Sequence, residues 1–165
     1  MTKITKQGFT LTELMAVVII LAILMGIAAG GYRKATERSH FTEGLMAAHT
    51  VLEAVERHHD RNPSVTRPLI DSLDIGLSHK KACTAAASAD RNYCARTTYF
   101  EVIIQTDGSV KAIRTNSKYT ITVFPESFGD NRFVKDTCAG KDENTDFCIS
   151  MGYTACTSGV CQKPD

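Results

Sequence analysis

The chain has 165 residues and is close to electrically neutral, with 19 Lys and Arg against 18 Asp and Glu. That balance gives no electrostatic basis for broad nucleic-acid binding, so we expect no specific nucleic-acid partner. The sequence contains no Gly-x-Ser-x-Gly, no His-Glu-x-x-His and no phosphate-binding glycine loop, which argues against an enzyme. A cysteine nucleophile stays open only if a cysteine is left unpaired.

The first eight residues differ from a secretory signal peptide. Lys3 and Lys6 make this leader, residues 1–8, basic, and Gly8 ends it. A secretory signal places its small cleavage-site residue after an apolar core of roughly 7–15 residues, whereas Gly8 precedes the apolar run. Cleavage after Gly8 would therefore leave the hydrophobic segment on the mature chain.

An apolar segment follows the leader. No side chain from Leu14 to Ala29 carries a charge. At about 1.5 Å per residue, a helix from Leu14 to Tyr32 nearly crosses a ~30 Å hydrocarbon core, so we expect a membrane span at about 14–32. Glu13 lies at the start of this span, where a carboxylate without a partner costs roughly a few kcal/mol. The position of this acid requires an explanation.

Gly8, Phe9, Glu13, the apolar run and Tyr32 together resemble the class III signal of type IV prepilins and the related pseudopilins. The resemblance implies that a membrane-embedded prepilin peptidase cuts between Gly8 and Phe9 and that the new N-terminus at Phe9 is methylated. It also implies that Glu13 of one copy pairs with the Phe9 amine of its neighbour when copies assemble. The alternatives are a plain signal anchor that matches by accident, and a Glu13 that only reaches toward lipid headgroups.

The resemblance further implies what the protein does and where. The leader stays in the cytoplasm, a single-pass anchor holds the subunit in the lipid of the inner membrane, and an assembly platform there builds a helical homo-oligomer on the cell surface. We expect a structural subunit of a type IV pilus, without cofactor or metal. The alternatives are a pseudopilin of a type II secretion system and a minor or DNA-uptake pilin.

Helical patterning continues beyond the span, so we expect one helix over residues 9–58. A stripe of apolar residues at helical spacing should bury against a sheet of the same chain. Its members are Phe41, Leu45, Ala48, Leu52 and Val55. Asn62-Pro63 ends the pattern because proline cannot continue a helix. Gly30 and Gly31 weaken it by roughly 1 kcal/mol each and mark either a flexible point or a close-packing position.

Two metal sites are considered and not expected. His49, His58 and His59 miss the i, i+4 spacing of a helical metal site. Acidic and amide side chains in the tail resemble the calcium-binding region of the major pseudopilins, but without EF-hand spacing. These residues are Asp136, Asp142, Glu143, Asn144 and Asp146.

Residues 59–165 are expected to form one globular head. Runs of β-branched and aromatic residues predict strands at about 97–104, 110–115 and 119–124, followed by a Cys-rich tail over 126–165 that contains few apolar residues. Three antiparallel strands laid on the amphipathic half of the long helix give an α+β fold, which the resemblance also implies.

Six cysteines, all in the head, are an even number and favour disulfides in an exported domain. Six cysteines allow fifteen pairings, and the sequence cannot choose among them. We favour the pairs that close short loops, which are Cys83–Cys94, Cys138–Cys148 and Cys156–Cys161. A zinc site is disfavoured because no Cys-x2-Cys pair occurs.

Overall fold

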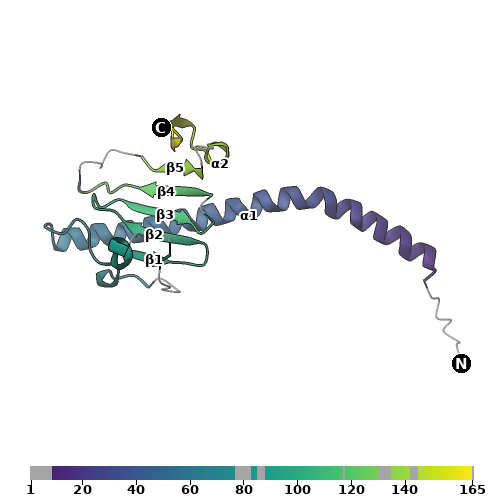
Figure 1. Ribbon diagram of the computed structural model, residues 1–165, viewed down its shortest axis with the longest axis horizontal. Helices are drawn as coiled ribbons and strands as arrows, with labels where there is room; N and C mark the ends of the chain where they lie inside the picture. Colours follow the sequence, from purple (N-terminus) through teal and green to yellow (C-terminus); the bar gives the residue numbers. More distant parts are fainter. Residues whose placement is uncertain are drawn as a thin grey trace, which may run out of the picture. The chain divides into compact units, whose positions relative to one another are not determined.

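The computed structural model describes residues 9–76, 83–84, 88–116, 118–129, 135–141 and 145–164. The chain divides into two compact units, Met1–Ser39 and His40–Asp165. The described part of the first unit is helical from Leu11 onward, and the second unit contains the outer part of that helix and a sheet (Figure 1).

Helix α1 spans Leu11–Arg61. It therefore starts two residues later and ends three residues later than expected from the sequence. At its end, the backbone N–H of Asn62 donates to the carbonyls of His58 (2.9 Å) and His59 (3.1 Å), which extends the last turn up to Pro63. Proline has no N–H to donate and stops the helix there.

In the described residues, the head contains one antiparallel sheet of seven strands in the order β1-β2-β3-β4-β5-β7-β6. The strands are β1 (Cys94–Arg96), β2 (Phe100–Ile104), β3 (Val110–Arg114), β4 (Tyr119–Val123), β5 (Thr137–Gly140), β6 (Ala155–Thr157) and β7 (Val160–Gln162). The part of the chain that the structure describes also contains three short helices: η1 (Ile70–Ser72), η2 (Ser88–Tyr93) and α2 (Asp146–Ser150).

The outer part of α1 lies along one face of this sheet (Figure 1). Its buried residues are Phe41, Gly44, Ala48, Val51, Leu52, Ala54 and Val55. They pack on strand residues that alternate along β2, β3 and β4, such as Phe100, Ala112 and Ile121. Leu45, which we expected in the stripe, is only partly buried. Its neighbour Gly44 is buried instead and lies close to Phe100 of β2. A Cβ atom on Gly44 would lie 2.5 Å from Cε1 of Phe100, so only glycine fits without a shift.

Two parts of the sheet differ from the sequence prediction. The expected strand at 97–104 is shorter, because the N–H of Thr97 donates to the carbonyl of Phe100 (2.8 Å) and closes a turn between β1 and β2. The expected three strands are part of seven, because the tail adds β5, β7 and β6 beyond β4. Hydrogen bonds between backbones join these three strands to the sheet. Such bonds require no apolar pattern of side chains, so the sequence did not indicate these strands.

Three disulfides join Cys83 to Cys94, Cys138 to Cys148 and Cys156 to Cys161. Two of them hold the tail: one ties β5 to α2, and the other links facing residues of β6 and β7. The third covers the face of β2 that points away from α1, where it packs with Ile103 and Ile113.

Candidate assembly site

A capping box fixes the first turn of α1 and engages the acid at the start of the apolar segment. The backbone N–H of Thr10 donates to Oε2 of Glu13 (2.9 Å), and the Thr10 hydroxyl donates to the same oxygen (2.7 Å). The N–H of Glu13 lies 3.4 Å from the Thr10 hydroxyl oxygen. Thr10 is thus the N-cap and Glu13 the third helical residue, a reciprocal pairing that satisfies backbone donors with no partner inside the helix.

This contact was not predicted, although the sequence carries a signal for it. Thr10-Leu11-Thr12-Glu13 has the Thr-x-x-Glu pattern that precedes an apolar run at a helix start. A carboxylate in the first turn also interacts favourably with the helix dipole. Glu13 therefore has a partner in its own chain, and a bond to a neighbour must add to this contact or replace it.

Phe9 directly precedes the capping box, and its side chain is 81% exposed. Gly8, on the other side of the expected cleavage point, lies outside the described residues. Cleavage before Phe9 would place a cationic amine one residue from the N-cap and four residues from Glu13 along the chain.

The apolar surface of α1 is uncovered along the whole expected span. Ile27 is 76% exposed and Tyr32 is 73% exposed, and the most apolar 18-residue window of the helix has a mean hydropathy of 2.6 with none of it buried. By length and composition α1 can cross a membrane. Within the described residues nothing packs on this surface, so lipid or other helices must cover it.

Gly30 and Gly31 do not interrupt α1, which continues through both residues. A Cβ atom at either position would meet no described atom within 4 Å. Neither glycine is therefore required by packing within the described part of its own chain.

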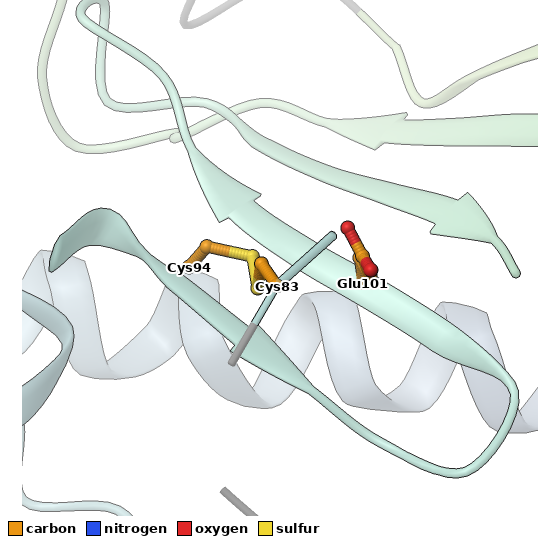
Figure 2. Close-up of side chains that lie close together, drawn as sticks. All are labelled: Cys83, Cys94 and Glu101. Atoms are coloured by element: carbon orange, nitrogen blue, oxygen red, sulfur yellow. A yellow bond between two sulfur atoms is a disulfide. The ribbon is translucent and has the colours of Figure 1, made fainter. Parts of the chain in front are cut away.

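The side chains of Cys83, Cys94 and Glu101 form the one group of potential metal ligands among the described residues (Figure 2). The two sulfur atoms are joined in a disulfide and offer no thiolate to a metal. Glu101 is 1% exposed, and its carboxylate accepts hydrogen bonds from the N–H (2.8 Å) and the hydroxyl (2.7 Å) of Thr84. Arg96 Nε lies 3.8 Å from it. This cluster therefore fastens the segment at Cys83 to the sheet.

The histidines near the end of α1 do not converge. His49 Nε2 lies 2.9 Å from Oδ2 of Asp136, and this hydrogen bond raises the pKa of His49. His59 stacks on Phe128 at a centroid distance of 4.0 Å. His58 Nδ1 is buried, with no hydrogen-bond partner among the described residues.

The expected acidic cluster of the tail is only partly described. Asp136 pairs with His49, and Asp146 begins α2, while residues 142–144 lie outside the described part. Burial raises the pKa of Tyr153 to about 12, and the nearby Asp136 carboxylate adds to the shift.

Residues 4–29 match the family model of the prokaryotic N-terminal methylation motif. The match covers Gly8, Phe9, Glu13 and the whole uncharged run from Leu14 to Ala29. The chain therefore carries the class III signal of type IV pilins and pseudopilins, and its long apolar helix, antiparallel sheet and C-terminal disulfides form a pilin-like α+β fold. No solved structure matches the chain.

Proposed function

We propose that this pilin-like chain is a structural subunit of a type IV pilus. The observation that carries the proposal is the uncovered apolar surface of α1. This helix has an acid in its first turn, and its outer part belongs to a folded, disulfide-bonded head. A helix exposed in this way is suited to two successive environments, lipid before assembly and packed copies of itself afterwards. The proposed parts are a leader over 1–8, a span at about 14–32 and a head from about residue 59.

Processing creates the group that assembly needs. Prepilin peptidase cuts between Gly8 and Phe9 and the new amine of Phe9 is methylated. In the filament this cationic amine pairs with Glu13 of a neighbouring copy. Opposite charges attract more strongly in an apolar helix bundle than in water, and an unpaired carboxylate there is costly, so the pair favours docking of a new subunit.

Location and partners follow from the same steps. The subunit is held in the inner membrane with its leader in the cytoplasm, is processed there, and enters a surface filament through an assembly platform. Gly30 and Gly31, which have no packing role in the described chain, supply a place where α1 can change conformation on assembly. We also propose that the exported protein keeps the pairs Cys83–Cys94, Cys138–Cys148 and Cys156–Cys161.

Electron microscopy of a deletion strain tests the proposal. We expect surface fibres to be absent from the deletion strain, to return with the wild-type gene, and to bind antibodies raised against the head. If fibres persist in the deletion strain while protein secretion fails, the chain is a pseudopilin and the pilus proposal is wrong.

A further inference from the structure

An exposed stripe of α1 in the first unit combines one apolar, one glycine and one basic residue. Ile27, Gly31 and Lys34 follow one another at i, i+4 and i+7 and therefore share a face of the helix. Ile27 is 76% exposed, and Lys34 is exposed. A Cβ atom on Gly31 would meet no described atom within 4 Å. We call these three residues the inner stripe.

A second exposed stripe lies on the part of α1 that belongs to the head. Met46, Thr50 and Glu53 have the same i, i+4, i+7 spacing, and all three are exposed on the side of α1 that faces away from the core. Met46 is 66% exposed, more than any other large apolar residue among the described residues of the head. Glu53 contacts Arg57 at 4.0 Å, a long and exposed ion pair that contributes little. We call these three residues the outer stripe.

The two stripes are complementary position by position. We propose that the inner stripe of one copy packs on the outer stripe of a second copy, with the two helices parallel and shifted by 19 positions. The shift brings three pairs together: Ile27 with Met46, Gly31 with Thr50, and Lys34 with Glu53. The occupant of the exposed face of the head is thus a second copy of this chain.

Each pair has a physical reason. Contact of Ile27 with Met46 removes two large apolar side chains from water, which is the main favourable term in association. The absence of a side chain at Gly31 lets the second backbone come close at Thr50, as small residues do at tightly packed helix interfaces. The pair of Lys34 with Glu53 adds opposite charges and fixes the register between the copies.

The surrounding charges act in both directions. Like charges also meet at this shift, for example Arg38 of one copy and Arg57 of the other, although Arg57 already contacts Asp74 at 3.1 Å. A cavity of about 710 Å³ beside Glu53 is lined by four carboxylates and two lysines. This excess of carboxylates favours the approach of Lys34 of the second copy to Glu53.

The inference rests on the proposed function, since a parallel shift needs copies that share one orientation in a filament. It adds the residues that set the register between copies. The Glu13–Phe9 pair, by contrast, lies at the other end of the helix and specifies nothing about the head.

Charge exchange tests the register in the full-length protein. We expect Lys34→Glu and Glu53→Lys each to lower the yield of sheared filaments by about tenfold, and the double variant to restore it to within about twofold of wild type. Asp146→Lys is the matched control, because Asp146 is an exposed acid of the head that lies on α2 and not on α1. A double variant as poor as either single variant overturns the inference, and so does a loss of the same size in Asp146→Lys.

Photo-crosslinking tests the contact with all charges intact and does not depend on how the charge variants fold. p-Benzoylphenylalanine at Met46 should, in purified filaments, form an adduct with the peptide that contains Ile27, as identified by mass spectrometry. The same probe at Ile149, an exposed residue of α2, should not. An adduct with any other peptide, or with a different protein, overturns the inference. If wild-type cells make no filaments, the proposed function fails; filaments without the adduct refute only the register.

Discussion

Substitution of Gly44 by alanine should destabilise the head although alanine is the better helix former. In a helix interior, the replacement of glycine by alanine normally stabilises the helix by roughly 1 kcal/mol, because alanine has the higher helix propensity. At Gly44, however, the new Cβ atom would lie 2.5 Å from both Cε1 and Cζ of Phe100 and 2.9 Å from Cδ1. Phe100 is fully buried, so its ring cannot move away from the new Cβ atom into solvent. Overpacking of a core typically costs about 1–3 kcal/mol, and the largest clash here involves a whole ring edge.

We therefore expect Gly44→Ala to lower the free energy of unfolding of the head by about 1–2 kcal/mol, seen as a fall in melting temperature of several degrees. The assay is thermal unfolding of the full chain in detergent, followed by near-ultraviolet circular dichroism of the tyrosines in the head. Gly30→Ala is the control, because a Cβ atom there meets nothing within 4 Å and lies outside the head. It should leave the head transition unchanged. A Gly44→Ala protein as stable as wild type would refute the packing argument.

Three further predictions concern assembly, pH and redox state. Glu13→Ala should still be processed, as seen on gels, but should form no filaments in micrographs. Thr10→Ala removes the hydroxyl of the same capping box and should still assemble. An equal loss of filaments in both variants would mean that Glu13 acts only as a helix cap. The pKa of His49 is raised mainly by its hydrogen bond to Asp136, so this pair should stabilise the head below the unfolded pKa of histidine, near 6.5, and lose that effect as pH rises through the raised value. The melting temperature of His49→Asn, measured between pH 5.5 and 8.5, should lack that component. A mild thiol reductant should open Cys156–Cys161 before the other two disulfides, because Cys156 is exposed and the cysteines of the other two disulfides are buried. Alkylation followed by mass spectrometry gives the order of opening. Earlier opening of a buried disulfide would contradict this prediction.

Features that depend on local patterning could be predicted from the sequence. The uncharged run from Leu14 to Ala29 is long enough to predict a membrane span. The stripe from Phe41 to Val55 repeats a helical period that no β-strand produces. The β-branched and aromatic residues of the expected strands 110–115 and 119–124 likewise placed β3 and β4. Each of these strands ends one residue earlier in the structure than expected. The capping box was not predicted but could have been, because Thr10 and Glu13 stand at the spacing that such boxes require.

Features that depend on contacts between distant segments could not be predicted. His49 and Asp136 are 87 positions apart, and nothing near either residue indicates the other. The strands of the tail are three or four residues long, and all three residues of β6 are exposed, so they carry no alternation. Glu101 is polar in sequence and fully buried in the structure, because its partner Thr84 is brought to it by a disulfide.

The proposed function requires that the chain is cut before Phe9 and keeps its apolar helix for assembly. Top-down mass spectrometry of the protein in isolated membranes and sheared filaments tests it directly. We predict one species that begins at N-methylated Phe9 and has a mass 6 Da below that of the fully reduced chain, as three disulfides require. A species that retains Met1, or one trimmed beyond Ala29 so that the apolar segment is lost, would contradict the account.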